Sequence, residues 1–206
     1  MAGEIVQPRA TGFFIVSLNS SRKEVVELSF DEVAKLSCQK KNGATMFESL
    51  KDGEYYTFFT DCDHYCETIE PPDDDYIDDV KERMMTNLGK LLNDQFTDEH
   101  KGTFGMATRH GVHVEKNVYK LSWRCYFFGF VLTLSEMRKV IVKKGLDKAG
   151  VGSLDSSPYN KNQLLGCVGF CKSQIDKRIL VPCDASQPLE KFMVQNVAGA
   201  EVVFGL

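Results

Sequence analysis

Two aspartates one residue apart end an aromatic run, and their spacing suits a divalent metal ion. Residues 55–67 read YYTFFTDCDHYCE, which contains Asp61 and Asp63. In a strand these two side chains point to the same face about 7 Å apart, so their carboxylates repel unless a positive charge lies between them. Mg²⁺ and Mn²⁺ prefer carboxylate oxygen and would supply that charge. The alternative is a strand that ends in a turn, where aspartate is common.

A second polar group alternates with apolar residues in the longest strand candidate, YKLSWRCYFFGFVL. Its period of two places Lys120, Ser122 and Arg124 on one face. Two cations and a hydroxyl suit the oxygens of a phosphate group. The alternative is a solvated strand face. Asp155 and Lys172 follow downstream. Taken alone, Asp155 would be interpreted as a turn residue and Lys172 as a surface residue.

Zinc is a further possibility raised by the cysteines and histidines. Its usual ligand types recur at short spacing in two places, namely Cys62, His64 and Cys66, and Cys167 with Cys171. The alternative is free thiols in the core, because a strand would point the first three residues away from Asp61 and Asp63. His110 and His113 lie in an expected loop, where a catalytic role is the less favoured reading.

Composition indicates an ordinary globular protein. The chain has 206 residues, 43% hydrophobic and 26% charged, with a net charge of −4. We expect a single domain over residues 1–206, or two sub-units of about 1–50 and 51–206. The chain has seven cysteines, an odd count, and starts without a secretory signal, so we expect reduced thiols and an intracellular protein, nuclear or cytoplasmic. It lacks long apolar runs, so we expect no membrane partner.

Hydrophobic periodicity predicts a mixture of strands and helices. Expected strands are residues 12–18, 54–63, 103–108, 119–132 and 178–182. Expected helices are residues 30–41, 76–95 and 134–144, the first and third with capping boxes. Residues 109–117 are expected to form a turn or hairpin loop, and residues 163–170 a strand or short turn structure. Because a clean βαβ repeat is lacking, we predict an α+β fold with a mostly antiparallel sheet and flanking helices.

In their order along the chain, these motifs resemble the catalytic core of the archaeo-eukaryotic primases, in particular the primase-polymerase branch of large DNA viruses and eukaryotes. The first family motif is an apolar strand ending in D-x-D, matched by YYTFFTDCD. The second is S-x-H on a strand, matched by SWR at 122–124. The third is an apolar residue followed by Asp, matched at 154–155, with Tyr159 close behind. The resemblance covers roughly residues 45–182.

The resemblance implies an RRM-like primase core and a metal-dependent nucleotidyltransferase that makes or extends primers on single-stranded DNA. Asp61, Asp63 and Asp155 would hold two Mg²⁺ or Mn²⁺ ions, which would activate a 3′-hydroxyl and steady the leaving pyrophosphate. An incoming NTP or dNTP would bind five residues. These are Lys120, Ser122, Arg124, Tyr159 and Lys172.

Two positions depart from the family pattern. Arg124 stands where the family has histidine, and Gly166 stands where it often has arginine. Arginine binds phosphate bidentately but does not exchange protons near neutral pH. A second hypothesis is therefore a catalytically weakened primase-like domain that binds nucleotide or nucleic acid as a replication adaptor. A third is an unrelated α+β protein, which would follow if Asp155 lay far from the other two aspartates.

The expected partners follow from motifs that the sequence lacks. It contains no G-x-x-x-x-G-K-[ST] motif, so either the chain is a domain of a larger protein or a helicase or other replication protein supplies that activity. A single-stranded template would need a basic cleft beside the aspartates. The candidates for that cleft are Arg109, Lys116, Lys120 and Lys161.

Overall fold

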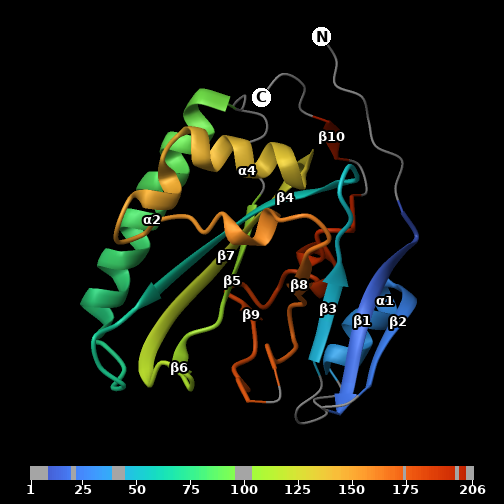
Figure 1. Cartoon of the computed structure of the whole chain (residues 1–206), viewed down its shortest axis with the longest axis horizontal. Coiled ribbons are helices and arrows are strands. Elements are labelled where there is room, and N and C mark those ends of the chain that lie inside the picture. The colour runs from blue at the N-terminus through green and yellow to red at the C-terminus, as the bar shows by residue number, and fades with distance from the viewer. Residues whose placement is uncertain are drawn as a thin grey trace.

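The computed structural model contains two sheets and helices, an α+β fold as predicted (Figure 1). The structure describes residues 9–19, 22–38, 45–95, 104–173, 175–197 and 200–202. None of the described helices is both long and apolar enough to cross a membrane.

The larger sheet has six strands and is built around one long central strand. Its members are β4 (Tyr55–Tyr65), β5 (Phe104–Thr108), β6 (Gly111–His113), β7 (Val118–Thr133), β9 (Val181–Pro182) and β10 (Glu201–Val202). β4, β5 and β6 pair with β7 in antiparallel register, and β5 also pairs with β9. Only the short β10 runs parallel to β7 among the described pairings. The sheet is therefore mostly antiparallel, as expected.

The smaller sheet has four strands in the order β2-β1-β3-β8. They are β1 (Thr11–Asn19), β2 (Arg22–Ser29), β3 (Thr45–Ser49) and β8 (Leu164–Gly166). Sequence periodicity did not indicate β2 or β3. Because β8 comes from late in the chain, this sheet joins the N-terminal strands to the segment that follows Asp155. The division into sub-units near residue 50 stays a prediction.

Three described α-helices cover the sheets. They are α1 (Phe30–Cys38), α2 (Asp74–Gln95) and α4 (Leu134–Lys143). The apolar stripe of α2 is buried against β4 and β7 in the main core, which confirms its predicted helical periodicity. Both capping boxes are present: Ser29 with Glu32, and Thr133 with Glu136.

Several predicted elements differ in detail from the structure. The helix predicted over 30–41 corresponds to α1, which is described as far as Cys38. Residues 39–41 lie outside the described residues. The predicted strand 178–182 shortens to β9, and the predicted loop 109–117 contains the short strand β6. The strand predicted over 12–18 is β1, which buries alternate side chains, so that Phe14 is buried whereas Phe13 is 42% exposed.

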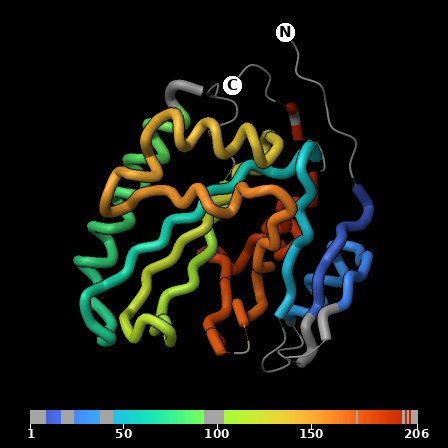
Figure 2. The backbone as a smooth tube through the Cα atoms, viewed as in Figure 1, coloured from blue at the N-terminus to red at the C-terminus, as the bar shows by residue number. Residues whose placement is uncertain are grey.

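After α4 the chain returns across the larger sheet. Figure 2 shows this segment, in orange, passing in front of β4 and β7 on its way to β8. The crossing brings Asp155 beside Asp61, where the two residues form an isolated β-bridge. Residues far apart in the sequence thereby meet on one face of the sheet.

Candidate functional site: an ion-paired cavity

Hydrogen bonds to β4 and to α2 hold the loop that carries Asp155 in place. The Asp155 backbone N–H donates to the Asp61 carbonyl at 2.7 Å. Upstream, the Asn87 side-chain amide on α2 donates to the Gly152 carbonyl at 2.9 Å. Gly152 has φ +79°, and a Cβ there would lie 2.6 Å from the Met84 backbone nitrogen, so this close approach requires glycine. Asp155 is therefore held beside the aspartate pair.

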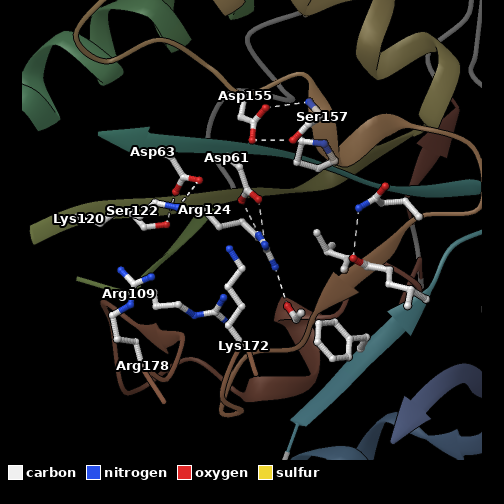
Figure 3. Close-up of a pocket in the computed structure, with 16 residues that line it drawn as sticks. Asp61, Asp63, Arg109, Lys120, Ser122, Arg124, Asp155, Ser157, Lys172 and Arg178 are labelled. Atoms are coloured by element: carbon white, nitrogen blue, oxygen red, sulfur yellow. Dashed lines mark hydrogen bonds and ion pairs between the residues drawn. The ribbon is translucent and has the colours of Figure 1, made fainter. Parts of the chain in front are cut away.

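The register between β4 and β7 sets the first ion pair. Asp61 lies directly opposite Arg124. The Arg124 guanidinium donates from Nε and Nη2 to the two Asp61 carboxylate oxygens, at 2.6 and 2.9 Å, and from Nη1 to the Gly166 carbonyl at 2.7 Å (Figure 3). Burial alone would lower the pKa of Arg124, but the Asp61 carboxylate outweighs it and keeps that pKa well above its usual value. The pair is a bidentate, largely buried salt bridge.

Asp63 is held in a similar way two residues further along β4. Its two oxygens accept from Lys120 Nζ at 2.5 Å and from Ser122 Oγ at 2.6 Å. Burial would raise the pKa of Asp63, but the Lys120 charge and these hydrogen bonds outweigh it and lower the pKa below its usual value. Lys120 is 3% and Arg124 7% exposed, so the alternative of a solvated strand face is wrong.

The third carboxylate is engaged within its own loop. Asp155 accepts hydrogen bonds from the Ser157 backbone N–H and hydroxyl, both at 2.8 Å. This is a local turn contact that also starts the 3₁₀ turn at 157–159. Figure 3 shows Asp155 and Ser157 on one side of the site and Lys172 on the other.

These side chains surround a cavity of about 160 Å³. Five cations and three carboxylates line it, which leaves a formal charge of +2. The cations are Arg109, Lys120, Arg124, Lys172 and Arg178, and the acids are Asp61, Asp63 and Asp155. The structure thus brings together seven of the eight residues that the sequence analysis assigned to the site.

The carboxylates as arranged do not fit a two-metal centre. Every oxygen of Asp61, Asp63 and Asp155 already accepts a hydrogen bond from a described residue. The guanidinium of Arg124 and the ammonium of Lys120 are bonded to two of these carboxylates, and their positive charge would repel a divalent ion beside them. Among the described residues, no group of three His, Cys, Asp or Glu side chains is arranged to hold a metal ion.

Tyr159, the eighth predicted site residue, does not line the cavity. It is 2% exposed, and its hydroxyl donates to the Phe59 carbonyl at 2.7 Å. The cause is the short 3₁₀ turn at 157–159, which directs the ring into the core against Phe59. A contact between Tyr159 and nucleotide stays a prediction, and this burial counts against it.

The cysteine and histidine candidates lie in structural surroundings. Cys62, Cys66, Cys167 and Cys171 are buried, and each is a free thiol. His110 Nδ1 accepts from the Ser122 backbone N–H at 3.0 Å, and burial lowers the pKa of His110 to about 4. His110 is therefore a neutral residue that fixes the β5–β6 connection against β7.

Two arginines of the cavity were not assigned to it from the sequence. Arg109 was named as a template contact, and Arg178 was read as part of a strand. Arg178 binds Asp176 through Nε and Nη2 at 2.8 and 2.6 Å, and Nη1 donates to the Gly111 carbonyl at 3.2 Å. No sequence spacing relates Arg178 to the other site residues, so periodicity could not have identified it.

A second cavity of about 220 Å³ adjoins the first and shares Phe47 and Lys172 with it. Its remaining lining includes His113, Val114 and Ile175. An aromatic ring, an imidazole and aliphatic groups make this second cavity less polar than the ion-paired one. The ion-paired cavity is therefore adjoined by a more apolar one, whose lining also includes Glu115 and Asp176.

No protein-family model and no curated protein sequence matches this chain. The interpretation of the cavity therefore depends on its own residues and on the motifs in the sequence.

Proposed function

We propose that this chain is a primase-like domain that binds nucleotide through its phosphate groups. The observation that carries the proposal is the meeting of four distant segments at one cavity: the D-x-D strand, the K-x-S-x-R strand, the Asp155 loop and Lys172. This meeting is what the third hypothesis, an unrelated protein with coincident motifs, did not predict. The excess of two positive charges favours an anionic ligand.

The sizes of the two cavities support a nucleotide rather than a larger or smaller molecule. The ion-paired cavity, about 160 Å³, is smaller than the roughly 300 Å³ at which ligand pockets usually begin. It has room for phosphate groups but not for a whole nucleotide. The adjoining cavity of about 220 Å³ would receive the sugar and base, with Phe47 and His113 as stacking partners.

The sequence suggested two functions, nucleotidyl transfer and nucleotide binding by a catalytically weakened domain. The ion pairs favour the second. Arg124 neutralises Asp61, and Lys120 neutralises Asp63, so neither carboxylate is available to a metal ion without breaking a buried pair. The domain would then serve replication by holding nucleotide or a nucleic-acid strand. A partner would supply helicase activity.

Metal-dependent nucleotidyl transfer remains the second candidate, because Asp61, Asp63 and Asp155 all line one cavity. In that case the domain would have the RRM-like primase core inferred from the motifs. It would bind two Mg²⁺ or Mn²⁺ ions and use an NTP or dNTP as its substrate. Lys120 and Arg124 would first have to release their carboxylates. The two candidates therefore differ in a measurable requirement for metal.

Calorimetric titration of the chain with ATP and dATP, with and without Mn²⁺, tests nucleotide binding. We expect binding in both conditions, and a chain that binds neither nucleotide in either condition would disprove the proposal. Primer synthesis on single-stranded DNA then separates the candidates. Activity that requires Mn²⁺ and is lost in Asp155→Asn but kept in Arg83→Gln, an exposed change on α2, establishes transfer. Binding without synthesis establishes the adaptor.

A further inference from the structure

Arg109 differs from the other arginines of the cavity because no described acidic side chain is bonded to it. Arg124 is paired with Asp61, and Arg178 with Asp176, each through two hydrogen bonds. Arg109 is 7% exposed, yet its Nε and Nη2 atoms have no hydrogen-bond partner among the described residues. A buried guanidinium without partners costs stability, so a native chain that keeps one is expected to use it.

The surroundings of Arg109 explain how it comes to lie there. It follows β5 directly, and its backbone N–H donates to the Ser122 carbonyl at 2.9 Å. Its Nη2 lies 3.4 Å from the point where a Cβ on Gly166 would be. This is an ordinary contact distance, so the Arg109 guanidinium lies directly beside position 166. The arginine that the motif lacks at 166 is thus replaced in space by one from a different segment.

The charge around Arg109 is positive beyond what the acids balance. Burial and then the nearby charge of Arg124 lower the pKa of Arg109 to about 10, although Asp61 and Asp176 partly oppose this. Three ion pairs, Arg124–Asp61, Lys120–Asp63 and Arg178–Asp176, account for most of the charges. The charges that are left are those of Arg109, Lys172 and Asp155. Lys172 is exposed, and Figure 3 shows its side chain extending from the same side of the cavity as Arg109.

We propose that Arg109, together with Lys172, binds a terminal phosphate group and does so without a divalent metal ion. The unoccupied Nε and Nη2 form the edge of the guanidinium that matches two phosphate oxygens. Both atoms are buried, so the guanidinium turns toward the cavity when the anion enters. Nε and Nη2 lose no hydrogen bond in this turn, because they make none among the described residues.

The role of the metal follows from the fixed ion pairs. In a site with open carboxylates, a divalent ion would draw the phosphate in. Here Arg124 and Lys120 already neutralise Asp61 and Asp63, and the excess positive charge comes from protein side chains. Arg109 and Lys172 are the two cations of the lining that stay outside the ion pairs with Asp61, Asp63 and Asp176. A terminal phosphate offers these two cations about two negative charges near neutral pH, whereas a phosphodiester offers one. The ligand class is therefore a terminal phosphate of a nucleotide or of a strand end.

Calorimetric titration with pyrophosphate in EDTA tests this inference, which rests on the proposed function only for the identity of the natural ligand. We expect wild-type protein to bind pyrophosphate in EDTA, and Arg109→Gln to bind at least about tenfold more weakly, as the loss of a charge-assisted contact predicts. Arg83→Gln makes the same change at an exposed site and should bind as wild type does. Wild-type binding that requires Mn²⁺, or equal binding by Arg109→Gln, overturns the inference.

Thermal unfolding gives a second readout that does not depend on the variant binding anything. Because the buried Nε and Nη2 of Arg109 have no hydrogen-bond partner among the described residues, Arg109→Gln should melt no lower than wild type. The same concentration of pyrophosphate in EDTA should raise the melting temperature of wild type more than that of the variant. A large loss of stability in Arg109→Gln would mean that Arg109 is a structural residue and would overturn the inference.

Competition against pyrophosphate identifies the source of the phosphate. ATP as competitor indicates a free nucleotide, and a 5′-phosphorylated but not an unphosphorylated oligonucleotide indicates a strand end. Either result supports the inference. If pyrophosphate binds in EDTA while nucleotides bind under no condition, the inference stands and the nucleotide-binding function fails. If nucleotides bind only with Mn²⁺, the function stands and the inference fails.

Discussion

The Asp61–Arg124 pair allows a quantitative test of the reasoning about the site. Both carboxylate oxygens are bonded, and the Arg124 and Asp61 side chains are only 9% and 17% exposed. Removing one member of such a pair leaves a buried charge without compensation, which typically costs about 3–5 kcal/mol. We therefore expect Asp61→Ala and Arg124→Ala each to lower the free energy of unfolding by about 3 kcal/mol or more. The double variant should lose clearly less than the sum of the two.

Urea denaturation followed by far-ultraviolet circular dichroism measures these free energies, and the double-mutant cycle gives the coupling energy. Asp79 and Arg83 on α2 form the matched control, since they are the same two residue types at 2.9 Å but are 52% and 58% exposed. Their coupling should be only about 0.3–0.5 kcal/mol. If the Asp61–Arg124 coupling were no larger than this, the claim that Arg124 occupies Asp61 would be refuted.

Three further predictions follow from other contacts. Tyr159→Phe removes the hydrogen bond to the Phe59 carbonyl and should cost about 1 kcal/mol in urea denaturation while leaving ATP binding unchanged in calorimetry. Burial raises the pKa of Glu48 from 4.5 to about 7, so the folded state retains a proton that the unfolded state loses. Stability should therefore fall by up to about 3 kcal/mol between pH 4.5 and pH 8 in wild type relative to Glu48→Gln, compared by urea denaturation at both pH values. Thr133→Ala removes the cap that Thr133 shares with Glu136 and should lower stability by about 1 kcal/mol, measured by thermal unfolding.

The long elements could be predicted from the sequence because their patterns were complete. The apolar stripe of α2 recurs along most of a 22-residue helix, and β7 alternates polar and apolar residues over 120–126 before a continuous apolar run. β3 has only five residues, and β2 is an edge strand on which Val25 is 68% exposed. An edge strand buries little of its surface, so its residues need not follow the pattern that identifies a buried strand.

The site could be predicted in its residues but not in its pairing. The motifs identified Asp61, Asp63 and Asp155 and the polar face of β7, all of which line the cavity. Which carboxylate meets which cation depends on the register of β4 against β7. No short turn joins these strands to set that register. The sequence therefore predicted Arg124 as a phosphate contact, whereas in the structure it pairs with Asp61.

The hydrogen bond from Tyr159 to Phe59 joins residues 100 positions apart, and Arg124 and Asp61 are 63 apart. Contacts between such distant positions form slowly, because a long loop must close before they contribute any stability. During synthesis on a ribosome, the D-x-D strand emerges well before Arg124, Asp155 and Lys172. Asp61 and Asp63 gain their partners Arg124 and Lys120 only when β7 has followed, so the ion-paired cavity is complete only after Lys172 and Arg178 have also emerged.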